Sequence, residues 1–187
     1  ELPSGGTDAI SSAAKLLSDA KFPVILNGAG VILGNAIPAS QALAERLDSP
    51  VCCNYQHNDA FPGSHPLFVG PLGYNGSKAA MELIKEADVV LALGTRLNPF
   101  STLPGYNLDY WPNEAKLIQV DINPDRIGLT KPVSVGIVGD ARQVAEQILS
   151  RLAEKAGDAG REERRKLIAG KKAVWAETLY SMDFEQD

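Results

Sequence analysis

Apolar and polar residues follow two different periodicities along this chain, and each periodicity predicts a different element. Short, almost continuous apolar runs are typical of strands buried on both faces of a parallel sheet. Such runs occupy residues 22–26, 51–53, 89–93, 116–122 and 133–138. Apolar residues at helical spacing predict helices over residues 8–20, 37–47, 76–86 and 141–154. Strands that alternate with helices imply right-handed crossovers, so we expect an α/β fold with a Rossmann-like open parallel sheet of five or six strands and helices on both faces.

The predicted strands all end in polar or glycine-rich residues, and two of them run into long irregular stretches. In open parallel sheets, ligands bind at the carboxyl ends of the strands. These ends are predicted at residues 28–30, 54–55, 94–96, 121–123 and 139–140. The irregular stretches are residues 54–75 and 97–113, and loops of this length in a compact domain are usually functional or disordered. Ordinary turns account for the same residue types, so both readings of the strand ends stay open.

Two charged residues at these ends are candidates for ligand binding. Asp121 lies at the end of a predicted strand, where a carboxylate can accept hydrogen bonds from a ribose diol. Arg96 follows another strand, where a guanidinium can bind a phosphate through two hydrogen bonds. A turn carboxylate and a surface ion pair are the respective alternatives. Gly28 and Gly30 give only the first half of a dinucleotide fingerprint, because the next glycine is Gly34, one place late.

The chain offers no catalytic residue and no metal site. His57 and His65 lie in one loop, with no Ser or Cys obviously placed against them, and His65 before Pro66 is interpreted as a loop anchor. Cys52 and Cys53 point to opposite faces of a predicted strand, so we interpret them as two reduced, buried thiols. Two histidines without CxxC or HxxxH spacing provide no set of zinc ligands.

Composition narrows the class of protein. The 187 residues include 18 Lys and Arg against 23 Asp and Glu, a net charge of -5, which predicts neither nucleic-acid binding nor attraction to an anionic membrane. The apolar runs fall short of the roughly 20 residues that span a bilayer. We expect one domain over residues 1–156, followed by a charged linker or tail over residues 157–187 that leads to a C-terminal domain. A start at Glu1 without Met favours a piece cut from a larger protein.

Seven segments in a fixed order carry a resemblance to a known family. They are residues 22–30, 59–62, 65–66, 70–76, 87–96, 120–124 and 138–141. Together they resemble the central domain of thiamine-diphosphate-dependent enzymes of the acetolactate synthase and pyruvate oxidase group, a DHS-like NAD/FAD-binding domain type. The match extends from about Asp8 to Leu152. Residues 54–66 and 98–106 are most similar to the sulfoacetaldehyde acetyltransferase family.

This resemblance implies a function for the full-length enzyme. Such an enzyme uses thiamine diphosphate and Mg²⁺, and converts sulfoacetaldehyde and phosphate into acetyl phosphate and sulfite. It has three domains, so this chain would be the structural and catalytically inert middle one, without either half of the coenzyme site. The implied partners are the N- and C-terminal domains of the same chain, in a cytoplasmic homodimer or homotetramer. The alternatives are a free-standing ADP- or FAD-binding module and the middle domain of another such enzyme, for example acetolactate synthase.

The resemblance also implies site residues, because the domain in relatives either binds flavin or ADP across the strand ends or holds no nucleotide and serves as a scaffold. The implied nucleotide contacts are Gly28, Ala29, Gly30, Gly94, Thr95, Arg96, Asp121, Ile122, Asp140 and Ala141. The loop expected to face the active site or a flavin ring contributes His57, Asp59, His65, Gly73, Tyr74 and Asn75. Flavin-binding relatives carry an Asp-Asp-Arg type of segment after the position of Arg96, whereas this chain has Leu-Asn-Pro-Phe at residues 97–100. That departure counts against FAD.

Overall fold

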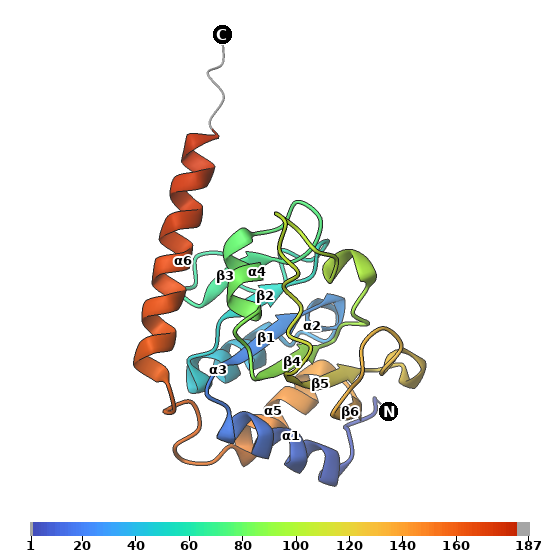
Figure 1. The fold of residues 1–187 in the computed structure, drawn as a ribbon. Helices are drawn as coiled ribbons and strands as arrows, with labels where there is room; N and C mark the ends of the chain where they lie inside the picture. Colours follow the sequence, from blue (N-terminus) through green and yellow to red (C-terminus); the bar gives the residue numbers. More distant parts are fainter. Residues whose placement is uncertain (1, 183–187) are drawn as a thin grey trace.

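The computed structural model describes residues 2–182 and shows a six-stranded, entirely parallel sheet (Figure 1). The strands are β1 (Pro23–Asn27), β2 (Val51–Cys53), β3 (Phe68–Pro71), β4 (Val89–Leu93), β5 (Lys116–Asp121) and β6 (Val135–Val138). Their order across the sheet is β3-β2-β1-β4-β5-β6. The expected Rossmann-like α/β fold is therefore confirmed. Strand order reverses between β1 and β4, which is the place where such sheets bind ligands.

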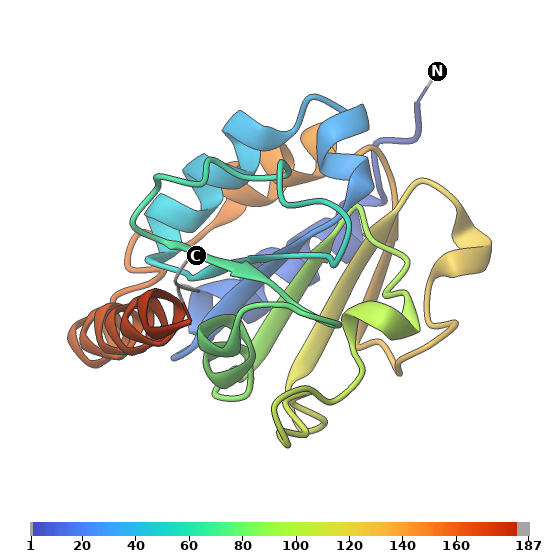
Figure 2. The same cartoon turned by 90° about the horizontal axis from the view of Figure 1, so that it is seen from above.

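Helices cover both faces of this sheet. The helices are α1 (Thr7–Asp19), α2 (Ala29–Leu33), α3 (Ile37–Leu47), α4 (Lys78–Ile84), α5 (Ala141–Arg151) and α6 (Arg161–Ser181). Figure 2 shows α2, α3 and α5 on one side of the sheet, with α4 and α6 on the other. Every residue of β1 and β4 is buried, and the two strands pair in register from Pro23 with Val89 to Asn27 with Leu93. This two-sided cover explains why both strands read as continuous apolar runs.

The expectation of one irregular stretch over residues 54–75 is wrong at its end, where β3 lies. Gly70 adopts a φ of 101° and Pro71 has no amide hydrogen, so the segment lacks the pattern of a central strand. Because β3 is at the edge of the sheet and pairs only with β2, a proline is tolerated there. The short helix α2 also begins directly after the glycine turn, where no helix was predicted.

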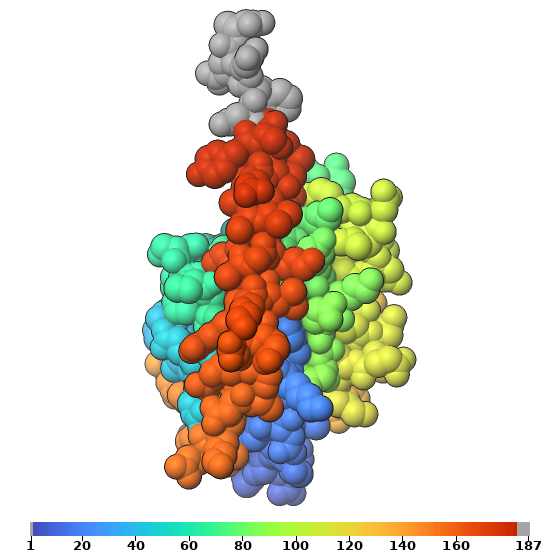
Figure 3. Space-filling model, turned by 60° about the vertical axis from the view of Figure 1, so that its left-hand side comes forward, coloured from blue at the N-terminus to red at the C-terminus, as the bar shows by residue number. Residues whose placement is uncertain are grey.

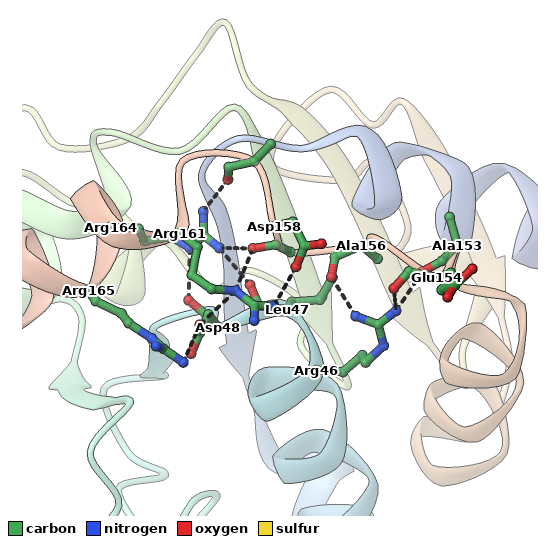
Figure 4. A network of polar contacts seen from close by, with 12 residues as sticks. Arg46, Leu47, Asp48, Ala153, Glu154, Ala156, Asp158, Arg161, Arg164 and Arg165 are labelled. Carbon is green, nitrogen blue, oxygen red and sulfur yellow. Dashed lines mark hydrogen bonds and ion pairs between the residues drawn. The ribbon is translucent and has the colours of Figure 1, made fainter.

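Helix α6 is attached to the rest of the fold by a buried arginine. Arg164 is only 1% exposed, and its guanidinium donates to main-chain oxygens of residues 21, 47, 48, 157 and 159 (Figure 4). Arg46 holds the preceding turn in the same way, through main-chain oxygens of residues 153, 154 and 156. The predicted charged tail is thus one helix from residue 161 to residue 181, packed against α4. Residues 183–187 of that tail lie outside the described residues.

Candidate functional site

A pocket of about 590 Å³ lies at the carboxyl ends of the strands. Nine of the ten residues predicted to contact a nucleotide line it: Ala29, Gly30, Gly94, Thr95, Arg96, Asp121, Ile122, Asp140 and Ala141. They come from the ends of β1, β4, β5 and β6, which parallel topology brings to the same edge of the sheet. The structure therefore gathers residues that are more than 100 positions apart in the sequence.

Two glycines, Gly30 and Gly94, form the wall of the pocket next to the reversal in strand order. The amide of Gly30 donates to the main-chain oxygen of Gly94 at 2.9 Å, which brings the two turns into direct contact. A Cβ atom on Gly30 would lie 2.7 Å from the Cα of Gly94, so a side chain cannot fit there. Gly28, the tenth predicted residue, does not line the pocket. It packs behind the wall, where a Cβ atom would lie 2.6 Å from the oxygen of Gly94.

The two predicted carboxylates each perform a local structural task. Asp121 accepts a hydrogen bond from the amide of Asn123 at 2.9 Å, which is the turn role that the sequence left open. Asp140 caps the N-terminus of α5 by accepting from the amide of Gln143 at 3.0 Å. Both side chains are buried. In each case the hydrogen bonds of the described residues engage one carboxylate oxygen, so the other can face a ligand.

Three arginines give the pocket a basic rim. Arg96 is joined by Arg126, which ends the short 3-10 helix after β5, and by Arg142 in the first turn of α5. Within residues 2–182, none of the three forms an ion pair with a carboxylate. The sequence reading missed Arg126 and Arg142, although each lies within five residues of a strand's carboxyl end. Unpaired guanidinium groups around a pocket suit an anionic ligand such as a phosphate.

Asn54, directly after β2, carries a polar atom with no partner. Its Nδ2 donates to Thr95 Oγ1 at 2.6 Å, and that same oxygen accepts from the amide of Leu97 at 3.0 Å. The carbonyl oxygen Oδ1 of Asn54 is buried, and no described residue donates to it. Because Asn54 lines the pocket, a ligand with a hydroxyl or N–H donor could satisfy this atom. The sequence marked Asn54 only as a strand end.

Of the loop residues that were predicted to face an active site, only one lines the pocket. His57 lines the pocket, whereas Asp59, Gly73, Tyr74 and Asn75 do not. His65 anchors the loop away from the pocket. Its Nδ1 accepts from the amide of Leu67 at 3.2 Å, which places the proton on Nε2, 3.1 Å from an oxygen of Glu45 on α3. The interpretation of His65 as a loop anchor agrees with this geometry.

The adjacent cysteines are not nucleophiles. Both thiols are free and buried in β2. Burial raises the pKa of the Cys52 thiol well above its usual value, with a smaller contribution from Cys53. Burial, followed by the nearby Asp59, raises the pKa of Cys53 to about 12. Neither side chain therefore forms a thiolate at neutral pH, which the nucleophilic chemistry of cysteine requires.

Two features are absent from residues 2–182. No group of three His, Cys, Asp or Glu side chains in that range is arranged to hold a metal ion. In the same part of the chain, none of the helices combines the length and the apolar character needed to cross a membrane.

Comparison with known proteins gives a consistent result. Residues 10–148 match the family described as "Thiamine pyrophosphate enzyme, central domain". The whole chain is 74% identical to the sulfoacetaldehyde acetyltransferase of Roseovarius nubinhibens, and 99% of it is 67% identical to that of Rhodobacter capsulatus. A probable acetolactate synthase large subunit of Methanocaldococcus jannaschii is 40% identical over 143 residues, which are 76% of this chain and 24% of that protein. The chain spans about 31% of the length of the two acetyltransferases.

Proposed function

Because this chain belongs to the thiamine pyrophosphate enzyme family, as its central domain, we propose that it is the middle part of a sulfoacetaldehyde acetyltransferase. The observation that carries the proposal is 74% identity over all 187 residues to a protein of that name. Similarity to an acetolactate synthase falls to 40% and covers only 143 residues. In this proposal residues 1–156 form the central domain, and residues 157–187 lead toward a C-terminal domain.

The whole enzyme would convert sulfoacetaldehyde and phosphate into acetyl phosphate and sulfite. Thiamine diphosphate, held with Mg²⁺, would supply the stabilised carbanion that this acyl transfer needs. The residues described here do not fit the metal, because residues 2–182 hold no cluster of acidic or histidine ligands. The chain alone would therefore be inactive. Its partners would be the other domains of the same protein, in a cytoplasmic homodimer or homotetramer.

The chain's own contribution would be to support those domains and to hold a nucleotide in the pocket at the strand ends. Arg96, Arg126 and Arg142 would bind phosphate oxygens, and the unpartnered oxygen of Asn54 would accept from a ribose hydroxyl. Ile122 would lie against the adenosine part of the ligand. We propose ADP before FAD, since the segment after Arg96 departs from that of flavin-binding relatives.

The acetyltransferase proposal is tested on the longer protein. That protein, loaded with thiamine diphosphate and Mg²⁺, is incubated with sulfoacetaldehyde and phosphate, and acetyl phosphate and sulfite are measured together. Equal amounts of both products support the proposal. Acetolactate formed from pyruvate, with no sulfite released from sulfoacetaldehyde, contradicts it. The 187-residue chain serves as the control and should release neither product.

The nucleotide site is tested on the 187-residue chain itself by thermal unfolding. A ligand present at 100 times its Kd raises the free energy of unfolding by about 2.7 kcal/mol, which is a shift of several degrees in a domain of this size. A shift with ADP or FAD supports a complete site in this chain. If neither ADP nor FAD raises the unfolding temperature, the domain has a purely structural role. A shift with thiamine diphosphate and Mg²⁺ would contradict the proposal that this chain lacks both halves of the coenzyme site.

A further inference from the structure

One end of the molecule is rich in aromatic residues. Four segments form this aromatic end, namely residues 54–58, 71–77, 97–108 and 173–182. Among these 34 residues, Glu177 is the single Asp, Glu, Lys or Arg, and charged residues flank the segments at Asp59, Lys78, Arg96, Asp109 and Lys172. The same segments contain six of the chain's twelve aromatic residues. Enrichment of Tyr, Trp and Phe is a compositional mark of protein interfaces.

Direct contacts join the four segments into one surface. The rings of Tyr55 and Tyr74 meet edge to face with centroids 6.2 Å apart, and the amide of Tyr74 donates to the main-chain oxygen of Phe100 at 3.3 Å. The hydroxyl of Tyr106 donates to the main-chain oxygen of Gly76 at 2.9 Å, and its ring meets that of Trp175 at 5.6 Å. The aromatic end therefore runs without a break from the ends of β2, β3 and β4 to the second half of α6.

Many apolar side chains of this surface are open to solvent. Tyr74 is 65% exposed and Tyr180 is 78% exposed. Phe100, Leu103, Val174 and Leu179 are each about half exposed or more. Figures 1 and 3 show that α6 extends past the body of the domain, so the second half of the helix projects next to the loops. A contiguous exposed apolar patch of this kind marks an interaction site in a soluble protein.

We infer that another domain of the same protein packs against the aromatic end, an inference that rests on the proposed function. The chain spans only 31% of its acetyltransferase relatives, and the matched family is defined as a central domain, so most of such a protein lies outside this chain. A second copy of this chain is the alternative occupant, and the experiment below distinguishes it from another domain. Tyr55 belongs both to this surface and to the pocket, so a domain packed against the surface would lie next to the pocket opening.

Hydrogen exchange measures this contact without relying on activity. Backbone amides are compared between the 187-residue chain and the longer protein. We expect exchange to slow at least tenfold across residues 71–77, 97–108 and 173–182 in the longer protein, and to stay unchanged around Leu129. Equal rates in both samples overturn the inference. Slowing that depends on the concentration of the 187-residue chain alone identifies a second copy and also overturns it.

Two substitutions sharpen the test. Tyr180→Glu and Tyr74→Glu alter exposed side chains, so neither should change the unfolding temperature of the 187-residue chain by more than a degree or two. In the longer protein each should restore fast exchange at the aromatic end. Leu129→Glu is the matched control, because Leu129 is 71% exposed and lies outside both the aromatic end and the pocket. Tyr180→Glu carries the test if Tyr74→Glu fails to fold. Unchanged protection in the Tyr180→Glu protein overturns the inference.

Acetyl phosphate formation is measured on the same samples, which separates the two proposals. If the longer protein forms acetyl phosphate but its aromatic end is not protected from hydrogen exchange, the inferred domain contact is wrong and the proposed function stands. Protection in a longer protein that releases no acetyl phosphate supports the surface and contradicts the function.

Discussion

The Nε–H of Arg164 donates to the main-chain oxygen of Asp48 at 2.9 Å, which joins α6 to the C-terminus of α3. Asp48 is in the left-handed conformation with a φ of 50°, the common way to end a helix. Its carboxylate pairs with Arg161 at 3.1 Å and with Arg165 at 2.8 Å. Three arginines of the first two turns of α6 therefore converge on one residue, where the negative end of the α3 dipole favours cations.

Replacing Arg164 should weaken the attachment of α6 to the C-terminus of α3. We expect Arg164→Ala to lower the free energy of unfolding by about 3 kcal/mol, because several buried main-chain oxygens lose their donor. Arg165→Ala is the control. Arg165 pairs with the same Asp48, but its side chain is 62% exposed, so it should cost less than about 1 kcal/mol. Urea unfolding of the two variants gives the comparison. Equal costs would show that burial of Arg164 does not stabilise the fold.

The contact between Gly30 and Gly94 predicts that alanine substitutions at two glycines change the stability in opposite directions. Gly30→Ala should lower the free energy of unfolding by about 2 kcal/mol, since the new methyl group meets the Gly94 backbone at 2.7 Å. Gly170→Ala, inside α6, should have the opposite effect. Its new Cβ has no neighbour within 4 Å, so the gain in helix propensity adds up to about 1 kcal/mol. Thermal unfolding of both variants checks the signs, and a neutral Gly30→Ala would contradict the close approach.

The basic rim of the pocket predicts how a nucleotide binds. We expect Arg96→Gln to weaken ADP binding about tenfold, or about 1.4 kcal/mol, through loss of a charge-assisted phosphate contact. Arg151→Gln is the control, because Arg151 ends α5 away from the pocket and hydrogen-bonds to Gln147. Calorimetric titration measures both affinities. If both variants bind ADP with the affinity of the parent chain, Arg96 does not bind the phosphates.

The buried thiols predict instability at high pH. The pKa of Cys53 rises from 9.0 to about 12 in the fold, and burial also raises the pKa of Cys52. An unfolded thiol therefore releases its proton at a lower pH than the folded one. The stabilisation is complete below pH 9 and is lost as the pH rises from 9 toward 12. We expect Cys53→Ala to flatten this decline in urea midpoints measured at pH 8, 9.5 and 10.5, relative to the parent chain. Parallel declines would count against the prediction.

The sequence predicted the centre of the sheet better than its edge. β1 and β4 are covered on both faces, so burial alone determines their residues, and the apolar runs identify them. β3 has only one neighbouring strand, and Gly70 and Pro71 break its pattern, so it read as a loop. The place of the pocket was predictable for a related reason, since parallel strands all end at one edge of the sheet.

The remaining features depend on contacts between distant residues. Arg164 lies in a strongly charged run, which is typical of a solvated helix, yet it is buried because oxygens from residues 21, 47 and 48 surround it. Arg126 and Arg142 were not predicted as site residues, because only the folded sheet brings them to one pocket. Asn54 was predicted only as a strand end, because an unpartnered oxygen is a property of the packing around it.

The reversal of strand order also sets the sequence of folding events. β1 is complete at Asn27, but its neighbour β4 begins only at Val89, so one edge of β1 has no strand beside it while more than 60 residues are synthesised. Unpaired, apolar strand edges promote aggregation. Contacts so distant in sequence also slow folding, because the loop must close before they form. A ribosome that paused between residues 53 and 89 would therefore hold the chain in an aggregation-prone state.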